Sequence, residues 1–158
     1  MMKSCVHRNK AIGFACRVRR NLDFVLRQRE QGEDVHEVTQ IVLSTLGLVV
    51  FPWERECKAV SEMAASLPLN DLTSQGWPAW DFSKGTSSTL IDLIRHLRNA
   101  VAHGHIWFAS DDRKAENVVL TFRDKRPEEK EYRWEASITA AHLRIFCEKL
   151  VDLVFQTQ

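Results

Sequence analysis

The sequence has no apolar run long enough to cross a bilayer. Its strongest run, IVLSTLGLVVF at 41–51, is well short of the roughly 20 residues that a transmembrane helix needs. Near the N-terminus the longest apolar run, AIGFAC at 11–16, is too short for the core of a signal peptide. These absences argue against a membrane protein and predict a soluble, cytoplasmic one.

The chain also lacks an excess of charge of one sign. Its 22 basic and 21 acidic residues nearly cancel, so no overall field favours a nucleic-acid partner. The balance is uneven, because residues 1–31 hold eight Lys or Arg against Asp23 and Glu30. A basic N-terminal arm, 1–17, is therefore a candidate RNA contact, although such a bias is more often a solvated surface.

The four cysteines form no C-x-x-C pair. Cys5, Cys16, Cys57 and Cys147 are scattered, which argues against a zinc ribbon and a disulfide framework and predicts reduced thiols. The sequence contains no motif of the P-loop, dinucleotide-binding, zincin or serine-hydrolase classes. This argues against the commonest NTPases, dinucleotide-binding enzymes, zinc proteases and serine hydrolases.

What the sequence does contain is a helical pattern along most of its 158 residues. Apolar residues recur at helical spacing, which predicts helices over 18–30, 34–51, 53–66, 87–104 and 139–155. Alternating apolar and polar residues predict strands at 106–108, 117–123 and 132–138, with a loop over 67–87. We expect one mainly α domain, 1–158, built as a bundle of four to five helices with a β-hairpin insert, 106–138, before the last helix.

The helix expected over 87–104 has two different faces. Its core side is apolar and consists of Leu90, Ile94, Leu97 and Val101. At about 100° per residue, Arg95, Asn99 and His103 follow one another on the opposite side, and the long side chain of Arg98 can swing towards them. These groups suit a charge stabiliser, a positioning group and a proton carrier.

Spacing alone is weak support for a ribonuclease site. An Arg and a His with four to six residues between them recur by chance, and Arg29 and His36 also satisfy this pattern. The conjunction adds weight, because Asn99 follows Arg98 directly and His103 lies in the last turn of a capped, amphipathic helix. The alternative is a solvated helix end.

RNAVAH, residues 98–103, resembles the R-[polar]-x(3)-H signature of the HEPN superfamily. Through LGLVVFPWE (46–54), HLRNAVAHG and a hairpin ending in RWEASI, the sequence is also similar to a plasmid- and phage-associated branch of small HEPN proteins. The resemblance spans about 18–155 and implies a helical bundle that commonly dimerises. Many members are metal-independent ribonucleases of toxin–antitoxin, antiphage and RNA-processing systems.

By this resemblance Arg98 and His103 are the catalytic pair and Asn99 is its polar neighbour. It implies a homodimer without metal or cofactor, RNA as substrate, and an antitoxin or another protein as partner. Neutral His103 would take the proton of a 2′-hydroxyl while Arg98 stabilises the phosphoryl charge, leaving a 2′,3′-cyclic phosphate. A helix C-terminus favours the charged form of His103 and nearby arginines oppose it; the charged form suits an acid better than a base.

Arg95 and His105 are weaker candidates for RNA binding. Arg95 is either a second phosphate contact or a solvated helix residue. A metal site shared by His96, His103 and His105 is disfavoured, because their spacing imposes no ligand geometry. Trp107 either stacks on a base or packs in the hairpin.

Two rival interpretations remain open. In the first, a non-catalytic HEPN dimer binds RNA or a partner protein, and charge reversal at Arg17, Arg19 and Arg20 abolishes binding. In the second, the motif is structural, and Arg98 and Asn99 hydrogen-bond across the dimer to hold it together.

Overall fold

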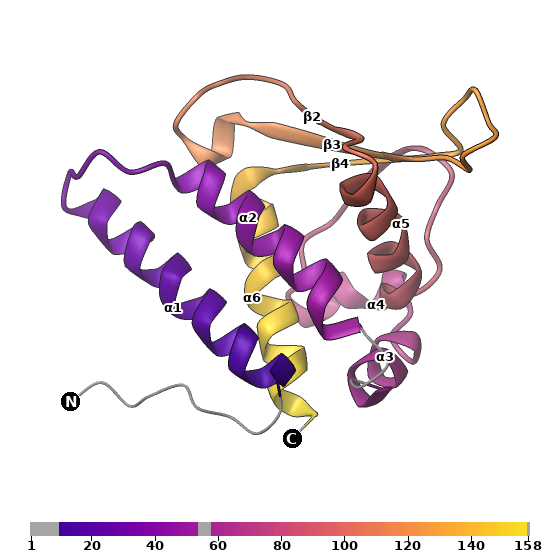
Figure 1. Cartoon of the computed structure of the whole chain (residues 1–158), viewed down its shortest axis with the longest axis horizontal. Coiled ribbons are helices and arrows are strands. Elements are labelled where there is room, and N and C mark those ends of the chain that lie inside the picture. Colours follow the sequence, from indigo (N-terminus) through magenta and orange to yellow (C-terminus); the bar gives the residue numbers. More distant parts are fainter. Residues whose placement is uncertain (1–9, 54–57, 158) are drawn as a thin grey trace.

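The computed structural model describes residues 10–53 and 58–157, and these form a mainly helical structure (Figure 1). The helices are, in chain order, α1 (Lys10–Glu30), α2 (Glu37–Val50), α3 (Lys58–Ala65), α4 (Leu69–Leu72), α5 (Leu90–Ala102) and α6 (Ala140–Gln156). The strands are β1 (Asp81–Lys84), β2 (Ile106–Phe108), β3 (Val119–Asp124) and β4 (Trp134–Thr139). The mainly α class predicted from the sequence is therefore confirmed.

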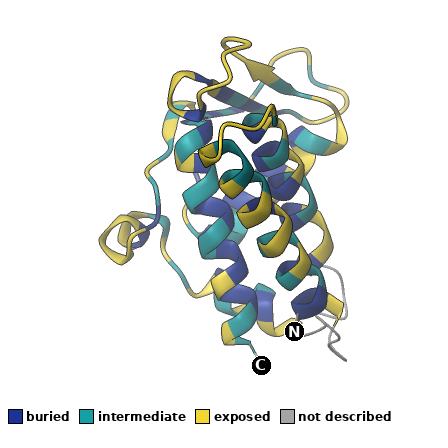
Figure 2. Ribbon diagram, turned by 90° about the vertical axis from the view of Figure 1, so that its left-hand side faces the viewer, coloured by how far each residue is buried: buried dark blue, intermediate teal, exposed yellow. Residues whose placement is uncertain are grey.

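The strands form one antiparallel sheet in the order β1-β4-β3-β2. The sheet lies across one end of the helices, as Figures 1 and 2 both show. Side chains alternate across a strand, so every second residue of β3 and β4 is buried. These buried residues are Leu120, Phe122, Asp124, Trp134, Ala136 and Ile138. Because β3 packs on α5, the sheet fixes the position of that helix.

The helical part of the core forms where α1, α2 and α6 pack together. Figure 2 shows their buried residues facing inwards. Gly47 permits a close approach of α2 to α1, since a Cβ there would lie 2.7 Å from the Phe14 ring. Phe14 also stacks on Phe51, with ring centroids 4.8 Å apart, so the end of α2 is held against α1.

The expected β-hairpin is part of a larger sheet than the sequence predicted. β3 and β4 form that hairpin and β2 lies beside it, but β1 comes from 67–87, which was expected to be a loop and also contains α4. In β1 only Phe82 is even partly buried, so the strand shows no alternating pattern. It is held by pairing with β4, a contact that the local sequence does not indicate.

The expected N-terminal arm also needs correction. Of residues 1–17, those from Lys10 onwards form the start of α1, and 1–9 lie outside the described residues. The helix extends this far because Ala11, Ile12 and Ala15 are buried in the core. Arg19, named above as an arm contact, instead pairs with Asp152 of α6.

One other expected helix begins later than the sequence suggested. α2 begins at Glu37 rather than at Asp34, with His36 at its N-cap. The described part of α3 runs from Lys58, because the expected residues 54–57 lie outside the described part of the chain.

The cysteines differ from the expectation of reduced thiols. Cys16 is disulfide-bonded, whereas Cys147 is a buried free thiol. The prediction is thus wrong for Cys16, and cysteine usage no longer supports a reducing compartment. Among the described residues, no helix is both long and apolar enough to span a membrane.

Candidate active site

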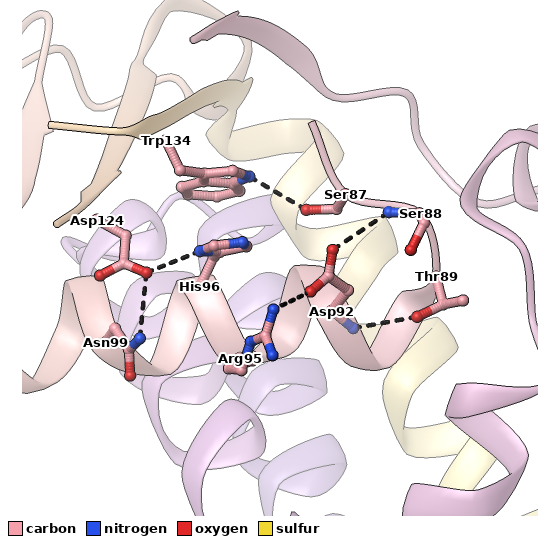
Figure 3. Close-up of polar contacts among 9 residues, drawn as sticks. All are labelled: Ser87, Ser88, Thr89, Asp92, Arg95, His96, Asn99, Asp124 and Trp134. Carbon is pink, nitrogen blue, oxygen red and sulfur yellow. Dashed lines mark hydrogen bonds and ion pairs between the residues drawn. The ribbon is translucent and has the colours of Figure 1, made fainter. Parts of the chain in front are cut away.

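The N-terminal end of α5 is closed by its own side chains (Figure 3). Thr89 Oγ1 accepts a hydrogen bond from the backbone N–H of Asp92 at 3.3 Å, and the Asp92 carboxylate accepts one from the Ser88 N–H at 3.3 Å. These bonds satisfy donors that a helix start leaves unpaired. Arg95 pairs with the same carboxylate. Arg95 is therefore exposed but engaged, which favours its role as a solvated helix residue.

One face of α5 is deeply buried and sets the rotation of the helix. Its buried residues are Leu90, Leu93, Ile94, Leu97 and Ala100. Full burial of a Leu or Ile side chain contributes about 1.5–3 kcal/mol. Turning α5 would expose this face, so Arg98, Asn99 and His103 are held on the solvent side, where all three are exposed. Val101, expected on the core side, is only partly buried.

Asp124, at the end of β3, joins the middle of α5 to the sheet. Its Oδ2 lies 2.7 Å from Nδ1 of His96 and accepts a hydrogen bond from Nδ2 of Asn99 at 3.1 Å. The carboxylate is buried, at 7% exposure, and such a group needs partners to offset its lost hydration. Figure 3 shows both side chains of α5 reaching the same oxygen. Asn99, expected to position substrate, thus has a structural partner.

The His96 ring is fixed from its other side by Trp134 of β4. The two rings stack with centroids 4.8 Å apart and 9° between their planes, and the indole Nε1 donates to Ser87 Oγ at 3.1 Å. Sequence reasoning missed this arrangement, because Asp124 falls between the strands expected over 117–123 and 132–138. Its place in the alternation Leu120, Phe122, Asp124 is the signal that predicts an inward side chain.

The C-terminal end of α5 is closed by a Schellman motif. The backbone N–H of Gly104 donates to Val101 and that of His105 donates to Ala100, at 3.2 and 2.8 Å. Gly104 has φ +67°, a left-handed conformation that suits glycine at this position. The expected end of the helix is therefore confirmed. His103 is the C-cap residue, with its side chain outside the last turn.

An aromatic cluster lies beside His103 and consists of His105, Trp107 and Tyr132. The centroid of the His103 ring lies 5.7 Å from that of His105, which lies 5.1 Å from Tyr132. Trp107 lies 5.8 Å from Tyr132 and 6.3 Å from His105. The structure thus brings His105 to His103, and it packs Trp107 against Tyr132 and Arg123 of the hairpin while 40% of its surface stays exposed.

Arg98 lies apart from this cluster. It lines a hollow of about 350 Å³ whose wall also includes Arg95 of α5 and Trp53, beyond the end of α2. Within residues 10–53 and 58–157, no hydrogen bond joins Arg98 to His103. Five positions correspond to about 140° around the helix axis, so one copy of the chain does not bring the two groups together.

Comparison with known proteins identifies the family. The model of the family HEPN pEK499 p136 matches residues 2–158. The chain belongs to this HEPN family. No match was found among curated proteins or among solved structures.

Membership confirms the resemblance drawn from RNAVAH and shows a HEPN protein over nearly the whole chain. It does not assign roles to single residues. Arg98, Asn99 and His103 as catalytic residues, and Arg95 and His105 as RNA contacts, stay predictions. In the part of this HEPN protein that the structure describes, no three His, Cys, Asp or Glu side chains are grouped to hold a metal ion.

Two side chains near or behind the site have shifted pKa values. The pKa of Glu135 on β4 is lowered, first by the hydroxyl of Ser83 and then by Arg123, which also pairs with it. Glu135 therefore stays ionised and holds Arg123 beside the aromatic cluster.

Burial raises the pKa of Cys147 to about 12, which keeps that thiol protonated and removes it as a nucleophile.

Proposed function

We propose that this HEPN protein is a metal-independent endoribonuclease that acts as a homodimer in the cytoplasm, as a toxin or antiphage-defence effector. In this proposal 1–158 is one HEPN-like domain, and α1, α2, α5 and α6 have the bundle arrangement of the family. RNA is the substrate, and an antitoxin or other protein is a further partner.

The observation that carries the proposal is the availability of Arg98 and His103. Both are exposed, and neither side chain makes a hydrogen bond or ion pair with another described residue. By contrast, Arg95, His96 and Asn99 on the same helix are engaged with carboxylates of their own chain. A guanidinium and an imidazole left in solvent are free to meet a substrate.

In the proposed reaction, neutral His103 removes the proton of a ribose 2′-hydroxyl. The 2′-oxygen forms a bond to the adjacent phosphorus, and the bond from phosphorus to the 5′-oxygen of the next nucleotide breaks. Arg98 stabilises the negative charge on the phosphoryl oxygens. The partner subunit's His103 gives a proton to the departing oxygen, so the products are a 2′,3′-cyclic phosphate and a 5′-hydroxyl.

The second copy is needed for a geometric reason. Arg98 borders the Trp53 hollow whereas His103 contacts His105, so the pair is incomplete within one chain. Two α5 helices that pack about a twofold axis place the Arg98 of one copy near the His103 of the other. Dimerisation is therefore part of the catalytic proposal.

The test is incubation of purified protein with RNA in the presence of EDTA. We expect cleavage by the wild type, loss of cleavage in His103→Ala, and 3′ ends that carry a cyclic phosphate by mass spectrometry. His142→Ala is the matched control, because His142 is an exposed histidine at the start of α6. Equal cleavage by the wild type and His103→Ala would remove this site from consideration.

The alternative is a non-catalytic HEPN dimer that binds RNA or a partner protein. It predicts that His103→Ala leaves function intact in a cellular assay. The basic contact surface that this alternative expects receives less support from the structure. Arg19 on α1 pairs with Asp152 and lies over the Phe155 ring, 5.0 Å from its centroid.

A further inference from the structure

We propose that the aromatic cluster beside His103 stacks on an unpaired base next to the bond that is cut, so that the substrate is single-stranded there. This rests on the proposed function in one respect, namely that RNA is what reaches His103. The observations that carry it are the ring contacts, the cations beside them and the character of the surrounding sheet face.

Trp107 is placed as a contact surface and not as a core residue. It lies on β2, at the edge of the sheet, and 40% of its surface is exposed. Its ring nevertheless has defined neighbours, because the rings of His105, two residues earlier, and Tyr132, before β4, lie beside it. A large aromatic side chain that is exposed but held in place is suited to stacking, since little conformational entropy is lost on binding.

Two cations accompany the rings. The guanidinium carbon of Arg123 lies 4.3 Å from the centroid of Trp107, and Lys125 Nζ lies 5.4 Å from that of Tyr132. Arg123 is held there by its pair with Glu135. Aromatic faces that stack bases, together with cations that meet the phosphates, are the combination by which proteins hold single-stranded nucleic acids.

Apart from Val119, which is 37% exposed, the rest of this sheet face is polar, which argues against an apolar protein partner. Thr121, which pairs with Trp107 in the sheet, hydrogen-bonds Ser137 at 2.9 Å, and Ser83 donates to Glu135 at 2.6 Å. The aromatic cluster is therefore a small apolar site within a polar and charged surface. An RNA strand matches both parts, through its bases and its backbone.

The geometry also selects against duplex RNA. In a duplex the base faces are covered by neighbouring bases, and side chains reach mainly the 2′-hydroxyls and phosphates. Stacking on Trp107 or Tyr132 requires a base that has left the helix. His103 lies two ring contacts from Trp107, so the stacked base and the reacting ribose belong to the same short stretch of strand.

The experiment measures binding of a fluorescein-labelled, short, single-stranded 2′-O-methyl RNA of mixed sequence, which cannot be cleaved by 2′-hydroxyl attack. We expect Trp107→Ala to bind this probe roughly 5- to 150-fold more weakly by anisotropy, and Trp107→Phe to recover most of the loss. Phe108→Ala is the matched control and is expected to bind like the wild type. Phe108 is the next residue on β2, is similarly exposed at 51% and contributes to a different hollow.

The same probe annealed to its complement provides the second comparison. We expect weaker binding of the duplex and no effect of Trp107→Ala on it. Equal binding of the single strand by the wild type and Trp107→Ala overturns the inference, as does a wild-type protein that prefers the duplex. Tyr132→Ala changes a different segment of the same cluster. Weaker binding of the probe by this variant as well would show that the loss in Trp107→Ala does not come from a folding defect of that variant alone.

His103→Ala separates this inference from the proposed function. We expect it to fail to cleave ordinary RNA and to weaken binding of the probe much less than Trp107→Ala does. If no variant affects cleavage but Trp107→Ala still loses binding, the nuclease proposal fails and the stacking site stands. If cleavage depends on His103 but binding of the probe does not depend on Trp107, the nuclease proposal stands and the stacking site fails.

Discussion

The two ends of α5 differ in what their polar side chains do. At the beginning and middle of the helix, Asp92, Arg95 and His96 are all engaged with partners in their own chain. At its end, the side chains of Arg98 and His103 are exposed and make no hydrogen bond with another described residue, whereas Asn99 between them is bonded to Asp124. One helix therefore carries polar side chains that are engaged within the fold and, near its end, two that are available.

This difference shows why residue type alone does not reveal a site. His96 and His103 are both histidines of one short segment, but His96 is stacked on Trp134 and bonded to Asp124. A group whose hydrogen-bonding capacity is used inside the protein stabilises the fold, whereas a group left in solvent can bind a substrate. The following predictions test this contrast between engaged and available side chains.

The largest effect is expected from Arg98, with Arg95 on the same helix as the comparison. Arg98→Ala should lower the rate of RNA cleavage by about 100-fold or more, because a positioned cation that stabilises phosphoryl charge contributes this much. Arg95→Ala should change it by less than about threefold, since Arg95 belongs to an exposed ion pair of small energetic value. The measurement is cleavage of one RNA under single-turnover conditions. Equal losses in both variants would remove the distinction.

The Asp124 side chain should matter for stability. Asp124→Ala leaves the His96 ring and the Asn99 amide without their partner, and we expect a loss of about 1–3 kcal/mol in the free energy of unfolding. Urea denaturation checks this. Asp111→Ala, in the exposed loop after β2, is the control and should stay within about 0.5 kcal/mol. An unaffected Asp124→Ala protein would mean that the middle of α5 does not depend on the sheet.

The start of α5 is expected to respond more weakly. Thr89→Ala removes the hydroxyl that accepts from the Asp92 N–H, and replacement of an N-cap threonine costs about 1 kcal/mol. Thermal unfolding measures the loss. Ser74→Ala is a suitable comparison, since Ser74 is an exposed hydroxyl in the segment before β1. The two variants should differ, and identical unfolding curves would argue against a functional cap.

The smallest effect concerns pH and Glu135. Its pKa is lowered in the folded protein from the usual 4.5, so it stabilises the fold above that unfolded value, and this contribution is lost as the pH falls through the folded pKa. Glu135→Gln should therefore be less stable than the wild type at neutral pH. The difference in unfolding free energy should shrink in acid. A difference that is constant from neutral to strongly acidic pH would contradict the assignment.

Much of α5 was predictable from the sequence. The apolar residues Leu90, Ile94 and Leu97 recur on one face, and Thr89 and Gly104 are typical of a helix start and end. These signals are local, because capping and periodicity depend on neighbours within a few residues. β1 was not predicted, because the signal for it is not local. Its short, exposed segment is a strand only through pairing with β4.

By itself, the sequence determined the helical class, the limits of α5 and the exposed position of Arg98 and His103. Those properties follow from hydrophobic periodicity and backbone termination, which act over short distances along the chain. Only the tertiary structure decided that Asp124 engages His96 and Asn99, and that Trp107 and Tyr132 gather around His105. These contacts join segments far apart in the sequence, and they depend on sheet register and helix rotation, which the packed core sets.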